Sequence, residues 1–131
     1  MGVERVVTFA GGVPTWPAVR DLLAAHGFPA QARMIDGQLA FPDEEPPAGW
    51  RELRLGTPQG MVTARREGDQ VRLVTWGNAD AAMAQAWNAV TWAFAAAGGG
   101  RVGGPGGGQS ADEFRRAADL PAALRPAGGA G

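Results

Sequence analysis

Large apolar side chains are concentrated in the first three quarters of this chain, and glycine largely replaces them in the last quarter. Residues 1–97 hold 28 Leu, Ile, Val, Phe, Trp and Met residues besides the first Met, whereas 11 of the 34 residues from Gly98 onward are Gly. A packed core requires apolar side chains, and a glycine-rich backbone loses much conformational entropy when it is ordered. We therefore predict a single domain over residues 1–97, followed by a flexible Gly/Pro-rich tail over residues 98–131.

One short helix is expected inside this tail. Ser110 and Glu113 have the spacing of a capping box, in which the serine and glutamate side chains bind the free N–H groups at the start of a helix. Phe114 and Leu120 follow, and Pro121 ends the segment. The pattern predicts a short helix near residues 111–120.

Hydrophobic periodicity and turn residues predict the element order β-α-β-β-β-β-α. β-branched residues predict a strand over Val3–Phe9, and an apolar stripe capped by Thr15 predicts a helix that ends at Gly27. Asp36-Gly37 predicts a two-residue hairpin turn, because both residues tolerate a positive φ. A long helix is predicted to begin at Asn78 or Asp80 and to end at Ala97, after three further strands: Trp50–Leu55, Met61–Glu67 and Gln70–Trp76.

Short connections between these elements favour one antiparallel sheet with both helices on a single face, a two-layer α+β fold. The turn at Gly68-Asp69 determines the register of the last two strands, and this register gathers apolar side chains on one face. The helices are predicted to pack on that face, which carries Leu53, Leu55, Val62, Ala64, Val71 and Leu73.

The opposite face of the predicted sheet carries a mixture of aromatic and basic side chains. Trp and Arg are enriched in protein interfaces, because they combine a large contact area with directional polar groups. Trp92 lies on the side of the long helix away from its apolar stripe, where the tail, a second copy of the chain or a partner would cover it. The predicted partner-binding residues are Trp50, Arg54, Met61, Arg65, Arg72, Trp76 and Trp92.

Several kinds of catalytic chemistry require residue types that the chain lacks. It has no Cys, Lys or Tyr, one His (His26) and one Ser (Ser110). Cysteine nucleophiles, thiolate metal sites, Schiff bases and a P-loop lysine are therefore excluded. His26 falls at the end of a predicted helix, and no carboxylate on the same face would orient it. We predict no catalytic residue, no cofactor and no metal, and a non-enzymatic protein is favoured.

Two further motifs have structural interpretations that we favour. Gly98–Gly103 matches the dinucleotide-binding pattern G-x-G-x-x-G, but it follows a predicted helix where that pattern requires a strand. Asp43, Glu44 and Glu45 form the densest acidic cluster. We interpret this cluster as a solvated loop, with a docking site for a basic partner and a cation site as alternatives.

The charge balance and the hydropathy pattern limit the partners that this chain would attract. Twelve Arg and thirteen acidic residues give a formal net charge of −1, so no global field attracts nucleic acid or an anionic membrane. The N-terminal apolar run is too short for a signal peptide. The polar residues Gln85 and Asn88 make the long predicted helix amphipathic, so we do not expect it to span a membrane. We expect a cytoplasmic protein that does not bind a membrane.

These observations predict a small non-enzymatic protein that binds another protein or itself, as an immunity, adaptor or small-subunit protein does. A single-stranded nucleic-acid-binding module is the first alternative, because Trp stacks on bases and Arg pairs with phosphates, although the nearly neutral charge argues against it. A small enzyme with a site of carboxylates and Arg is the second alternative, and it would require a closed pocket. An ordinary solvent-exposed sheet face with no partner is a further interpretation.

Overall fold

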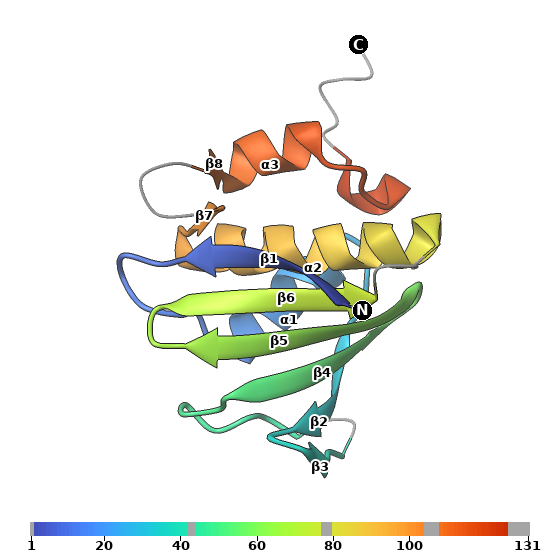
Figure 1. The fold of residues 1–131 in the computed structure, drawn as a ribbon. Helices are drawn as coiled ribbons and strands as arrows, with labels where there is room; N and C mark the ends of the chain where they lie inside the picture. Colours follow the sequence, from blue (N-terminus) through green and yellow to red (C-terminus); the bar gives the residue numbers. More distant parts are fainter. Residues whose placement is uncertain (1, 42–43, 77–79, 104–107, 126–131) are drawn as a thin grey trace.

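The structure is a computed structural model that describes residues 2–41, 44–76, 80–103 and 108–125, with only the backbone of residue 76 described. These residues form an α+β fold with one antiparallel sheet (Figure 1), which confirms the predicted fold class. The eight strands of the sheet follow the order β3-β2-β4-β5-β6-β1-β7-β8.

The first six strands and two helices follow the predicted order, with the hairpin predicted at Asp36-Gly37 forming the two strands β2 and β3. The strands are β1 (Gly2–Thr8), β2 (Gln31–Ile35), β3 (Gln38–Leu39), β4 (Glu52–Thr57), β5 (Gly60–Glu67), β6 (Gln70–Trp76), β7 (Arg101–Val102) and β8 (Gln109–Ser110). The helices are α1 (Trp16–Ala25), α2 (Ala81–Gly98) and α3 (Ala111–Ala117), and a 3-10 turn, η1, covers Ala122–Leu124.

Short turns determine the register of the central strands. Asp36 and Gly37 have φ angles of 50° and 83°, as the two-residue turn between β2 and β3 requires. Ala64 lies between Leu53 of β4 and Leu73 of β6 in the sheet, which is the predicted register. The core face of the sheet is therefore the predicted one, and its side chains are all buried: Leu53, Leu55, Val62, Ala64, Val71 and Leu73.

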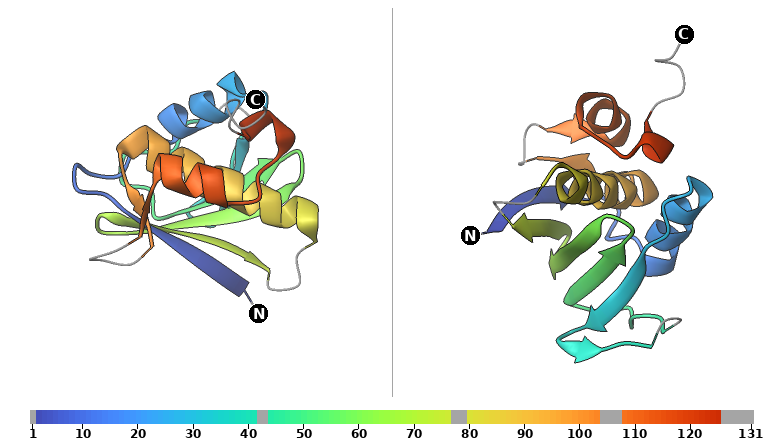
Figure 2. Two further views of the ribbon diagram at one scale, coloured as in Figure 1. Left: turned by 90° about the horizontal axis from the view of Figure 1, so that it is seen from above. Right: turned by 90° about the vertical axis from the view of Figure 1, so that its right-hand side faces the viewer.

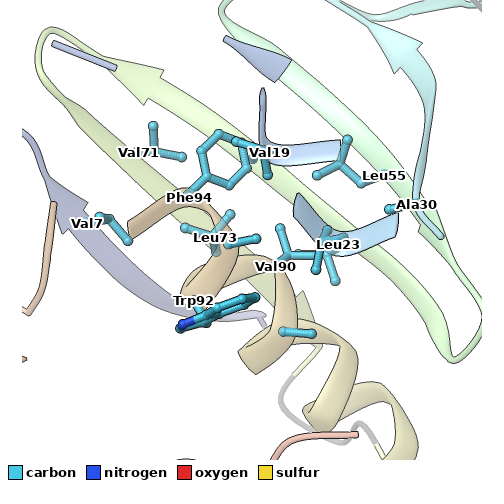
Figure 3. Packing of buried hydrophobic residues seen from close by; sticks show 14 of the residues in the cluster. Val7, Val19, Leu23, Ala30, Leu55, Val71, Leu73, Val90, Trp92 and Phe94 are labelled. Carbon is cyan, nitrogen blue, oxygen red and sulfur yellow. The ribbon is translucent and has the colours of Figure 1, made fainter. Parts of the chain in front are cut away.

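Helices α1 and α2 cover this face of the sheet. The hydroxyl of Thr15 accepts a hydrogen bond from the Ala18 N–H and caps α1, as predicted, and the Asp80 carboxylate caps α2. Phe94 of α2 and Leu23 of α1 lie in the core among the apolar side chains of the strands (Figure 3). No helix in the described part of the chain is long and apolar enough to cross a membrane.

The described part of the tail packs onto the rest of the fold. Strand β7 pairs with the end of β1, and α3 lies against α2 on the side away from the sheet (Figure 2). The predicted short helix is present as α3. Beyond residue 97, where the sequence analysis ends the domain, four described residues belong to the same core: Val102, Phe114, Leu120 and Leu124. Residues 104–107 and 126–131, for which flexibility was also predicted, lie outside the described residues.

Close packing explains why glycines at the start of the tail do not mark a boundary. A Cβ atom at Gly98 would lie 2.6 Å from a ring carbon of Phe9, and one at Gly100 would lie 2.7 Å from the same ring carbon. Gly99 has a φ of 64° and ends α2 in the left-handed conformation that glycine favours. These three glycines therefore bring the chain back against β1, a role that composition does not distinguish from that of a linker.

Candidate functional site

The face of the sheet opposite α1 and α2, called the open face below, carries no helix among the residues that the structure describes (Figure 2). Alternation along each strand sends every second side chain to this face. On the four central strands β1, β6, β5 and β4, the register places the following residues there: Glu4, Val6, Thr8, Glu52, Arg54, Met61, Thr63, Arg65, Glu67, Gln70, Arg72 and Val74.

A shallow hollow of about 590 Å³ lies on the open face. Arg54, Thr63 and Val74 are cross-strand neighbours in β4, β5 and β6, and Glu4 of β1 follows Val74 in the same row. This row crosses the hollow, so the hollow combines charged groups with apolar contact area. Its lining residues are Glu4, Arg54, Met61, Thr63, Arg65, Val74 and Thr75.

Two of the three predicted arginines on this face form ion pairs. Arg65 Nε lies 2.9 Å from Glu52 Oε2, its cross-strand neighbour in β4. Arg72 contacts two carboxylates, with its Nη1 at 3.0 Å from Glu4 Oε1 and its Nε at 3.5 Å from Glu67 Oε2. Such partly exposed pairs each contribute about 0–1 kcal/mol to stability, so their main effect is to neutralise this part of the face.

Arg54 and Met61 differ from the rest of the hollow. Arg54 is exposed, and none of the ion pairs within the described ranges includes it. The Met61 side chain is 44% exposed, which makes it one of the exposed large apolar residues of the structure. A guanidinium with no ion pair among the described residues and an exposed thioether therefore line the same hollow, on the face where the sequence analysis placed both residues.

The prediction that Trp50 lies on the open face is wrong. Trp50 is 2% exposed, and its ring lies 6.2 Å from that of Phe94 in α2. The guanidinium of Arg66 covers the ring at 5.0 Å. The error has a local cause: the Trp50 N–H donates to the Pro47 carbonyl in a turn, and β4 begins only at Glu52, so strand alternation does not extend to Trp50.

Trp92 is likewise buried, so its role as an accessible partner-binding residue is also wrong. It is 4% exposed, the Arg115 guanidinium of α3 lies 5.1 Å from its ring, and the His26 ring meets it edge-on at 5.3 Å. The tail helix covers this indole, which is one of the covers that the sequence predicted. The side chain of Trp76 lies outside the described residues, although its backbone pairs with Gly2.

Other residues that the sequence analysis considered have structural roles. His26 follows α1 and contacts Trp92, while the Ser110 hydroxyl accepts from the Glu113 N–H in the predicted capping box. The Ser110 backbone and side chain donate to the Glu113 carboxylate and lower its pKa. The described residues contain no cluster of three or more His, Cys, Asp or Glu that could hold a metal ion. Glu44 and Glu45 are exposed, and Asp43 lies outside the described residues.

Sequence reasoning missed the contribution of β1 to the open face. Glu4 pairs with Val74, and Val6 pairs with Arg72, across about seventy residues of chain. No short turn connects β1 to β6, so the turn residues could not predict this register. The available signal was strand alternation, which places Glu4 and Val6 on the same face of β1.

Comparison of the chain with models of protein families, with curated proteins and with solved structures finds no match. The residues of the open face are therefore the basis on which a function is proposed.

Proposed function

We propose that this protein binds another protein through the open face of its sheet. The observation that carries the proposal is that Arg54, unpaired among the described residues, and the exposed Met61 line one hollow. A partner that covers the hollow would remove apolar surface from water and place an acidic group against Arg54, and both changes stabilise a complex. Immunity, adaptor and small-subunit proteins of the cytoplasm, which act by covering or bridging another protein, are the class to which we assign it.

The character of the remaining open face favours a protein over a single-stranded nucleic acid. Base recognition of that kind uses exposed aromatic rings for stacking, and the two predicted partner-binding Trp rings that the structure describes, Trp50 and Trp92, are buried. Phosphate binding uses unpaired cations, and Arg65 and Arg72 are already paired with glutamates. What is left is a mixed apolar and charged surface, which is the composition typical of protein interfaces.

Introducing a negative charge at the hollow tests the proposal. Arg54→Glu and Met61→Glu place a negative charge at the two residues on which it rests, and Arg116→Glu makes the same change on the exposed side of α3. Cross-linked complexes are captured from cells of the source organism that produce each variant, and sedimentation of the purified proteins reports self-association. We expect wild type and Arg116→Glu to form the same complex, and the two hollow variants to lose at least about 10-fold in affinity while their thermal unfolding is unchanged.

The proposal would be refuted by retention of the complex in both hollow variants. A complex formed by nucleic acid instead would show affinity that falls steeply with salt concentration and that is abolished by nuclease treatment.

A further inference from the structure

Strand β1 is paired along its whole length on one side but only in part on the other. All seven of its residues pair with β6. On the opposite side, β7 pairs with Val7 and Thr8 only, and the Gly103 N–H donates to the Val6 carbonyl at 2.8 Å. Within the described part of the chain, no strand therefore covers this side of β1 from Gly2 to Arg5.

Hydrogen-bond alternation identifies the backbone groups that this edge presents. In an antiparallel strand, successive residues direct their N–H and C=O groups to opposite neighbours. The Val6 carbonyl points toward β7. Glu4 lies two residues earlier in β1, so its N–H and C=O point to the same side, beyond the last residues of β1 that pair with β7. Glu4 thus offers one donor and one acceptor in the position where an additional strand would bind them.

A groove follows this edge of the sheet. It has a volume of about 400 Å³, and residues of β1, β6 and the β7 end line it: Glu4, Arg5, Val6, Gln70, Arg72, Val102 and Gly103. The groove shares only Glu4 with the hollow, and it lies where the open face, with Glu4, Val6, Gln70 and Arg72, meets the β1 edge.

Arg5 pairs with Leu73, so its side chain points to the face of the sheet that the helices cover. Its guanidinium lies 4.3 Å from the ring of Trp87 and 5.2 Å from that of Phe114, and its Nε donates to Asn88 Oδ1 at 2.9 Å. No carboxylate of the described residues forms an ion pair with it. Burial lowers the pKa of Arg5, which indicates a guanidinium that is desolvated without a compensating anion.

From this arrangement we infer that the edge of β1, which no strand of the described residues covers from Gly2 to Arg5, binds an extended acidic peptide segment that adds as a strand beside β7. An antiparallel segment with one residue opposite Glu4 places its neighbouring residue opposite Arg5, on the same side of the sheet as the guanidinium. A Glu or Asp at that position would pair with Arg5 through charge-assisted hydrogen bonds. The backbone bonds provide affinity for any extended segment, and Arg5 provides selectivity for an acidic one.

This inference does not rest on the open-face proposal. The β1 edge and the hollow use different residues apart from Glu4, so Met61→Glu removes binding at the hollow and leaves the edge intact. Pairing of β1 with β1 of a second copy is disfavoured, because an antiparallel pair centred on Glu4 would place two glutamates opposite each other.

Binding of a designed probe tests the inference. The probe is a blocked heptapeptide of alternating Thr and Val with one central Glu, and the matched peptide has Gln in place of Glu. Titration into the full ¹⁵N-labelled chain is followed by the amide signals and by hydrogen exchange. We expect the Glu4 amide to shift and to exchange more slowly, and the acidic peptide to bind about 10-fold more tightly than its Gln counterpart, a difference of about 1.4 kcal/mol.

Variants at the edge separate the two parts of the inference. Arg5→Gln should abolish the preference for the acidic peptide, and Met61→Glu should retain it. Arg5→Gln also removes the contacts of Arg5 with Trp87 and Phe114, so it changes the packing as well as the charge, and a second pair of variants is compared. Glu4→Pro removes the outward N–H and should bind neither peptide. Glu4→Gln keeps that N–H and should bind both. Equal binding of the two peptides to wild type, no change at the Glu4 amide, or retained binding by Glu4→Pro would overturn the inference.

Discussion

Replacement of Phe114 by Ala tests whether the glycine-rich tail is part of the folded unit. Phe114 lies on α3, is 3% exposed and belongs to the same core cluster as the sheet residues. Truncation of a buried Phe to Ala typically costs 3–5 kcal/mol, and the short α3 at the surface would relax partly into the cavity. The ring also loses its contact with the Arg5 guanidinium, a contribution of about 0.5–1 kcal/mol. We therefore expect the free energy of unfolding to fall by about 3 kcal/mol.

Urea unfolding followed by Trp fluorescence measures this change, because Trp87 and Trp92 both lie near α3. With a slope of about 1.5 kcal/mol per molar urea, the midpoint should fall by about 2 M. Arg116→Ala, an exposed position on the same helix, is the matched control and should shift the free energy by less than about 0.5 kcal/mol. Equal stability of Phe114→Ala and Arg116→Ala would refute the reasoning, since it would show that α3 contributes nothing to the core.

Two further substitutions test packing and charge elsewhere in the fold. Gly98→Ala should lower the free energy of unfolding by about 1–3 kcal/mol in the same urea assay, because the added Cβ would lie 2.6 Å from a ring carbon of Phe9. Gly11→Ala is the control and should have little effect, because a Cβ there meets no atom within 4 Å. Asp36→Asn should make stability less sensitive to acid. Hydrogen bonds from the backbone N–H groups of Glu52 and Arg51 lower the pKa of Asp36, so the ionised carboxylate stabilises the fold at neutral pH. This contribution is lost as the pH falls below about 4, where the carboxylate becomes protonated. The difference between wild type and Asp36→Asn should therefore be largest near pH 7 and smallest in acid, and a constant difference across the pH range would contradict this assignment.

Local chemistry predicted most of the elements and part of the candidate site. The turns at Pro58-Gln59 and Gly68-Asp69 connect strands that are adjacent in the chain, so the register of β4, β5 and β6 and the exposure of Met61 followed from turn residues and alternation. Alternation failed at Trp50, where a turn precedes the strand. A side chain next to a strand end can follow either the sheet or the loop, and only the packing against Phe94 decides which.

The pairing of β1 with β6, and the tail's position over α2, depend on contacts between residues far apart in the chain. No short turn specifies either contact, and their stability comes from burial that exists only after the whole fold has formed. The amino-acid sequence by itself determined the α+β class, the register of the hairpins and the absence of thiol and lysine chemistry, because these follow from residue type and near neighbours. Only the tertiary structure decided that Trp50 and Trp92 are covered, because their cover comes from distant segments. Likewise, only the tertiary structure decided that, among the described residues, no strand covers one side of β1 from Gly2 to Arg5 and no acidic partner pairs with Arg5, because each depends on which distant segment occupies the adjacent space.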